Sequence, residues 1–173
     1  MKTATQLLVK IVYSQLAVYL IRCLIGFLLG YFLMLKFPKY ELFWLLLSII
    51  LVISPEEKDS RRLTFERVKS NFIGSCVGTV IYMIHDKSVL LLCIGIVITA
   101  IVCYLFKVMN MARVAIVSFL IVMLQSHVSE EVLTPLIRFS TVAIGCLIGL
   151  SITVLSSHFI RKIKKKYPLE GDV

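Results

Sequence analysis

The 173-residue chain is 59% apolar, has a mean hydropathy of +0.94 and carries a net charge of +9. Soluble domains average about 45–50% apolar residues, and a chain of this length has too little interior to bury the excess. This excludes a soluble globular protein. It also argues against a nucleic-acid partner, because the 19 Lys and Arg lie between the apolar runs and form no basic surface of their own.

Six apolar runs follow one another along the chain, and a transmembrane helix needs roughly 17–25 such residues. Lys2 and Lys10 precede the first run, but no small-residue cleavage site follows it, so we expect a span and not a cleaved signal. The second run is short, which suits a tilted or shielded helix. The predicted spans cover residues 13–35, 42–53, 72–84, 89–106, 114–124 and 136–160. We therefore expect an all-α integral membrane bundle of about six helices, in one domain covering residues 1–173.

The segments between these runs differ in charge. Residues 56–69 are the most charged segment and are expected to form a loop outside the lipid. With the N-terminus inside, 14 of the 19 Lys and Arg fall on the inner side and four on the outer side, while Arg22 lies within the first span. Basic residues accumulate on the cytoplasmic side of membrane proteins. The sequence therefore predicts that both termini are cytoplasmic, in what we expect to be a bacterial inner membrane.

The third and sixth runs share a spacing of one arginine and two glycines. The residues are Arg67, Gly74 and Gly78 in one, and Arg138, Gly145 and Gly149 in the other. A unit of three helices repeated once would give halves of opposite orientation, as in inverted-repeat transporters. The alternative is that the glycines only mark close helix packing.

Arg22 is the candidate functional residue that the sequence singles out first. It lies about ten residues into its span, roughly 15 Å at the helical rise, where a charge usually faces a cavity or a partner. At helical spacing it shares a face with Gln15, Tyr19, Gly26 and Gly30. The alternative is that its side chain extends towards the lipid headgroups.

Polar residues also mark the third and sixth runs, with Asn71 following Arg67 by one helical turn. No carboxylate falls in the middle of a run, so a cationic interior would favour anions as the transported species. The five cysteines and three histidines show no metal-ligand spacing, and no catalytic motif occurs. We therefore expect no enzyme, no cofactor and no metal site.

The order of these features resembles a known family. Arg22 lies in a glycine-bearing first span, Tyr40 and Trp44 open the second and Pro55 closes it, and two Arg-Gly-Gly sets follow. Over about residues 12–159 the chain is similar to the membrane domain of the fusaric acid resistance (FUSC) and aromatic acid exporter families. A related domain occurs in plant aluminium-activated malate channels. Many members carry Gly-Thr where this chain has Gly74-Ser75.

The resemblance implies six helices per unit and movement of aromatic or carboxylate anions. By position, the basic residues of an anion path would be Arg22, Arg67, Arg113 and Arg138. The malate channels assemble as dimers around a basic pore, so we expect a homodimer or a higher homo-oligomer, a small organic anion and membrane lipids as partners. The alternative is a non-transporting assembly partner or a lipid-binding scaffold.

Overall fold

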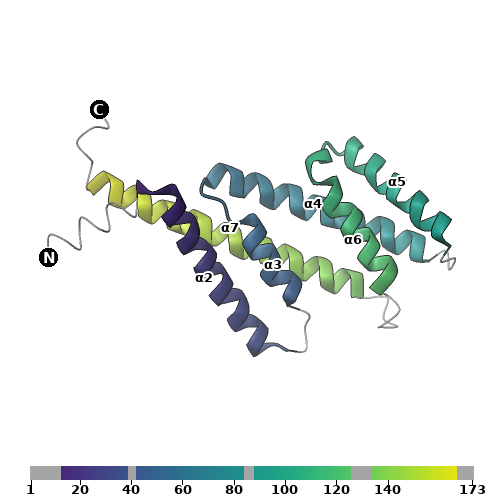
Figure 1. The fold of residues 1–173 in the computed structure, drawn as a ribbon, viewed down its shortest axis with the longest axis horizontal. Helices are drawn as coiled ribbons and strands as arrows, with labels where there is room; N and C mark the ends of the chain where they lie inside the picture. Colours follow the sequence, from purple (N-terminus) through teal and green to yellow (C-terminus); the bar gives the residue numbers. More distant parts are fainter. Residues whose placement is uncertain (1–12, 39–41, 84–87, 126–133, 167–173) are drawn as a thin grey trace. The chain divides into compact units, whose positions relative to one another are not determined.

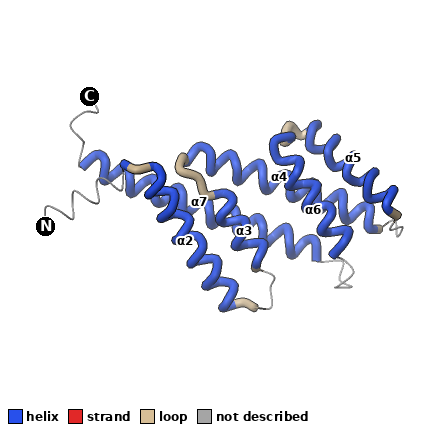
Figure 2. The backbone as a smooth tube through the Cα atoms, viewed as in Figure 1, coloured by secondary structure: helices blue, strands red, loops and turns tan. Residues whose placement is uncertain are grey.

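The computed structural model describes residues 13–38, 42–83, 88–125 and 134–166. These residues form six α-helices and one short 3-10 helix (Figure 1). They are α2 (Gln15–Lys36), α3 (Phe43–Val52), α4 (Glu57–Tyr82), α5 (Val89–Leu105), η1 (Met109–Met111), α6 (Ala112–Gln125) and α7 (Thr134–Lys166). No strand occurs in the described residues (Figure 2), which confirms the all-α prediction.

Helix α4 corrects one sequence expectation, because residues 57–69 of the charged segment are helical and do not form a loop. The helix begins at Glu57, which is 15 residues before the predicted third span. Acidic residues in a first helical turn interact favourably with the helix dipole, and Glu57 and Asp59 lie there. Arg61 bonds to Glu57 one turn earlier at 2.8 Å, and Arg62 pairs with Asp59 at 3.4 Å. This segment is both polar and helical. The lengths of the apolar runs mark only apolar helices, so they could not predict it.

Two of the described helices are long and apolar enough to cross a bilayer, namely residues Gln15–Lys36 and Pro135–Lys165. Three others are apolar but shorter, namely Phe43–Val52, Val89–Leu105 and Met109–Leu124. The ten residues of α3 extend roughly 15 Å, against about 30 Å of hydrocarbon. Six full crossings therefore remain a prediction.

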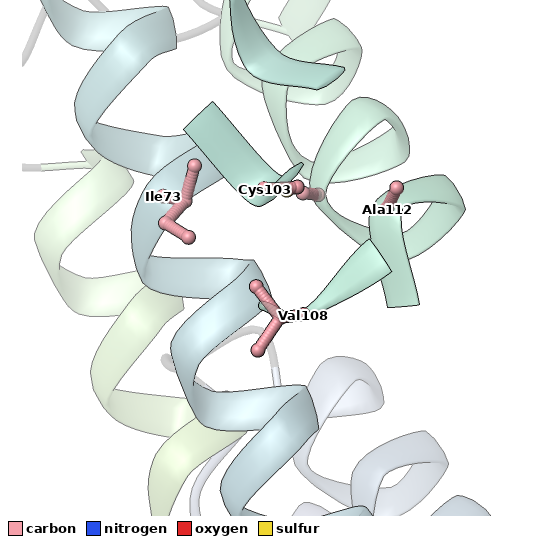
Figure 3. Close-up of a cluster of buried hydrophobic side chains, with 5 residues drawn as sticks. Ile73, Cys103, Val108 and Ala112 are labelled. Atoms are coloured by element: carbon pink, nitrogen blue, oxygen red, sulfur yellow. The ribbon is translucent and has the colours of Figure 1, made fainter. Parts of the chain in front are cut away.

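The chain divides into two compact units. Unit 1 comprises residues 1–62 and 145–173, and unit 2 comprises residues 63–144. In unit 1, α3 buries Leu45 and Ile49 against side chains of α2 and α7. In unit 2, one core cluster joins α4 to the residues around the α5–α6 connection (Figure 3). Its members are Ile73, Cys103, Val108, Ala112 and Ala115. Ile81, Phe119 and Met123 form a second cluster there.

Glycines set the closest helix contacts of unit 1. A Cβ atom added to Gly145 of α7 would lie 2.5 Å from the carbonyl oxygen of Leu45 and 2.9 Å from Cβ of Ser48. One turn further, a Cβ atom on Gly149 would lie 2.7 Å from the carbonyl oxygen of Ile49. Helix α7 therefore packs on the backbone of α3, where only glycine leaves room.

Unit 2 repeats this packing with other helices. Gly74 of α4 lies against the carbonyl oxygen of Ala115, and a Cβ atom there would lie 2.9 Å from Cβ of Ser118. Gly78 lies one turn on, beside Phe119 and Val122. Ala115, Ser118 and Phe119 occupy the places that Leu45, Ser48 and Ile49 hold in unit 1, 70 positions earlier. The glycine spacing seen in the sequence is thus a packing device used once in each unit.

Candidate anion pocket at Arg22

Helix α2 presents a narrow buried face, and Arg22 lies on it. The buried residues of α2 are Arg22, Gly26 and Gly30, at the three- to four-residue spacing of one helical face. The Arg22 side chain is only 2% exposed. Much of the remaining helix surface is apolar and exposed, with Leu24 at 61% and Leu28 at 63%. The face that the sequence predicted to be polar and small is the face that packs.

The Arg22 guanidinium is held by the end of α3 and by α7. One terminal nitrogen donates to the carbonyl oxygens of Ser54 at 2.7 Å and Pro55 at 2.8 Å. The other donates to Oγ of Ser157 at 2.8 Å. Carbonyl groups after a helix end lack partners inside the helix, and the helix dipole there attracts a cation. Arg22 therefore satisfies the chain end that follows α3 with charge-assisted bonds.

Two of the five N–H groups of Arg22 are left over, namely Nε–H and the second N–H of the nitrogen bound to Ser157. Nε of Arg22 is buried and has no hydrogen-bond partner among the described residues. A buried donor without a partner costs about 1–3 kcal/mol.

Arg22 lines a pocket of ≈ 280 Å³ in unit 1. Its polar lining consists of Gln15, Arg22, Glu57, Ser157, Arg161 and Lys164. Its apolar lining consists of Tyr13, Val18, Pro55 and Ile160. Three cations thus face a single carboxylate, and apolar side chains stand beside them. This combination suits an anion that also carries an apolar part.

Glu57 is the acid of this pocket and binds two arginines. Arg61 donates to one carboxylate oxygen at 2.8 Å, and Arg161 pairs with the other oxygen. The hydrogen bond from Arg61, aided by the charge of Arg161, lowers the pKa of Glu57 despite its partial desolvation. Lys164 lies over the ring of Tyr13, 4.5 Å from the ring centre.

The predicted site residues divide between the two units. Gln15 and Arg22 meet in the pocket, whereas Tyr19 packs into the apolar core of unit 1. The others belong to unit 2: Arg67 is half-buried, Asn71 and Arg138 are buried, and Arg113 is exposed at the start of α6. The carbonyl oxygen of Asn71 accepts from Ser118 at 3.4 Å.

Sequence reasoning missed most of the pocket. From the sequence, Glu57 falls in an expected loop. Arg161 and Lys164 belong to the basic residues that predict which side of the membrane the termini face. Ser157 lies 135 positions from Arg22, and no spacing rule links them. One signal was present: a Ser-Pro pair that ends an apolar run leaves carbonyl groups for a cation to satisfy.

Residues 13–152 match the family model of fusaric acid resistance protein-like proteins. This match covers well over half of the chain and confirms the resemblance. The chain belongs to the fusaric acid resistance protein-like family. No curated protein and no solved structure matches the chain.

The fusaric acid resistance protein-like family is one of membrane transporters and exporters, not of enzymes. The chain is accordingly a membrane protein of the transporter class. The matched residues include Arg22, Ser54, Pro55 and Glu57 but end before Ser157, Arg161 and Lys164. The pocket is therefore built partly from the family region and partly from the end of α7.

Proposed function

We propose that this chain is a small transporter or channel for organic anions, either aromatic acids or other carboxylates. The observation that carries the proposal is the pocket at Arg22, where three cations face one carboxylate in a protein of the transporter class. Carboxylate oxygens would bind the cations, and the apolar side chains would cover the organic part of the anion.

The preference of the pocket for anions over cations follows from how few acidic side chains line it. Among the described residues, Glu57 is the one acid that lines this pocket, so the site stays positive when Glu57 is ionised. A positive site lined by apolar groups attracts anions and rejects cations at short range. The same composition disfavours a proton path built on carboxylates.

The hydrogen bonds of Arg22 support the proposed orientation. They join the first half of α2, the end of α3 and the last turns of α7. The beginning of α2 and the end of α7 thus lie at the same end of unit 1. We place this end, with both termini, on the cytoplasmic side of a bacterial inner membrane, where the basic residues Arg161 to Lys165 meet anionic lipid.

The remaining arginines would extend the path. Arg67, Arg113 and Arg138, with Asn71, belong to unit 2, whose glycine packing repeats that of unit 1. We propose that the first three and the last three of the six spans form an inverted repeat, and that two or more chains assemble to enclose the path. Inverted repeats of this kind are common in secondary transporters.

The test is flux of benzoate or malate in proteoliposomes containing the purified chain. Replacing Arg22 by Gln should lower flux by at least about tenfold, because the charge-assisted hydrogen bonds, about 1.5–3 kcal/mol each, that hold three chain segments around the pocket are lost. The matched control is Arg62→Gln, since Arg62 is exposed, pairs with Asp59 and does not line the pocket. Unchanged flux in Arg22→Gln would refute the role of Arg22.

One observation favours a second candidate, a lipid-binding scaffold or assembly partner without transport. The terminal nitrogens of Arg22 are already bound to protein atoms, and Arg161 and Lys164 are exposed at the end of α7. A scaffold would show no flux of either anion in any variant, while anionic lipid would still raise its unfolding temperature.

A further inference from the structure

The cations of the pocket differ in what they already bind. Both terminal nitrogens of Arg22 donate to protein atoms, namely two carbonyl oxygens and Oγ of Ser157. Of the five N–H groups of Arg22, only the buried Nε–H and the second N–H of the nitrogen bound to Ser157 remain for an anion. Arg22 is a positioning residue that joins three chain segments, and the first contacts with an incoming anion belong to other cations.

Arg161 and Lys164 are those cations. The Arg161 side chain is 68% exposed, so it can change partners without unfolding the helix that carries it. Its partner is the carboxylate of Glu57, whose side chain is 20% exposed. The second oxygen of that carboxylate binds Arg61. Exposed ion pairs contribute little to stability, so an entering anion can replace Glu57 on Arg161.

We propose that Glu57 is a built-in competitor of the transported anion, occupying Arg161 in the empty pocket and setting the affinity of the site. The proposal rests on the proposed function and adds a residue that determines its affinity. An anion that enters takes Arg161 from Glu57, while Arg61 continues to hold the displaced carboxylate. A pocket that releases its anion readily needs such a competitor, because transport requires binding that is reversible on each side.

The charge balance around Glu57 predicts how the affinity depends on pH. The charged groups that face it are Arg61 on its own helix, Arg161 and Lys164 on α7, and Arg22 on α2. All of these groups are cations, so Glu57 is the acid of this set. Arg61 and Arg161 lower its pKa. Anion affinity should therefore rise only when the pH falls below the ordinary range of a glutamate.

The experiment is calorimetric titration of the purified chain with benzenesulfonate, which stays ionised throughout the acid range. Glu57→Gln keeps the size of the side chain and removes its charge, so it should bind about fivefold more tightly than the wild type, for a pair of about 1 kcal/mol. Arg161→Gln should bind more weakly, and the double variant should match Arg161→Gln. Asp59→Asn is the matched control, because Asp59 pairs with Arg62 and does not line the pocket.

The dependence of affinity on pH supplies a second measurement. Wild-type affinity should rise in acid, and the affinity of Glu57→Gln should not. Equal or weaker binding by Glu57→Gln, or wild-type affinity that stays flat in acid, would overturn the competitor role while leaving anion transport intact. Absence of both binding and flux in every variant would instead overturn the proposed function, and the competitor role with it.

Discussion

At the scale of single residues, Arg22 shows how a charge can reside in an apolar helix without a carboxylate bound to it. Its partners are two carbonyl oxygens after α3 and a serine hydroxyl on α7. An arginine is suited to this role because its planar group offers several donors in fixed directions. The side chain therefore links three segments, and the contribution of each bond to the free energy of unfolding can be measured.

Replacing Ser157 by Ala should lower the free energy of unfolding by about 1–3 kcal/mol, because it leaves a charged donor of Arg22 without an acceptor. Ser156 is the matched control, since it is equally half-buried and its hydroxyl bonds to the carbonyl oxygen of Thr153 in its own helix. Ser156→Ala should change stability little. Thermal unfolding in detergent compares the two variants. Equal losses of stability would mean that the Arg22–Ser157 bond contributes no more than the bond of Ser156 within its own helix.

At the scale of helices, the sequence predicts well where the apolar runs begin and end. It predicts less well where the helices themselves begin and end. The predicted second and fourth spans, 42–53 and 89–106, agree with α3 and α5 to within one residue at each end. Helix α4 begins 15 residues before the predicted start of the third span. Helix α7 continues to Lys166, past the predicted end at residue 160. Hydropathy marks where lipid can lie, whereas helix length also depends on ion pairs and capping.

The pocket was the least predictable part. Arg22 and Gln15 were found because periodicity places them on one helix face. The carbonyl oxygens of Ser54 and Pro55 could not be found, since backbone atoms leave no trace in residue type. Glu57 and Arg161 meet across 104 positions, and that meeting depends on how α4 and α7 pack within unit 1.

Glycine packing makes a prediction at this scale. Gly145→Ala should destabilise the protein by about 1–3 kcal/mol, because the new Cβ atom would lie 2.5 Å from a backbone oxygen of α3 that cannot retreat. Gly30→Ala is the control: there the nearest atoms, at 3.3 Å, are the ends of the Leu46 and Ile49 side chains, which can move. Denaturation in detergent should separate the two variants, and equal stability would contradict the contact.

At the scale of the whole molecule, the open question is which ends face the cytoplasm. In a variant without the five cysteines, Lys162→Cys should react with an impermeant thiol reagent only from the inner side. Lys36→Cys should react only from the outer side, because α2 is long enough to span. Leu24→Cys, on the exposed apolar face of α2, should react from neither. Labelling of Leu24→Cys from water would place α2 outside the lipid.

The division into units also has a consequence for synthesis. Unit 2 is continuous in sequence, whereas unit 1 needs residues on both sides of it. A ribosome adds about 5–20 residues per second, so the 82 residues of unit 2 separate the two parts of unit 1 by roughly 4–16 seconds. During that interval the new α2–α3 hairpin exists without Gly145, Gly149 and Ser157. The segment made first is thus the last to complete its packing, and a chain that stalls after residue 144 leaves Leu45 and Ile49 without the part of α7 that packs on them.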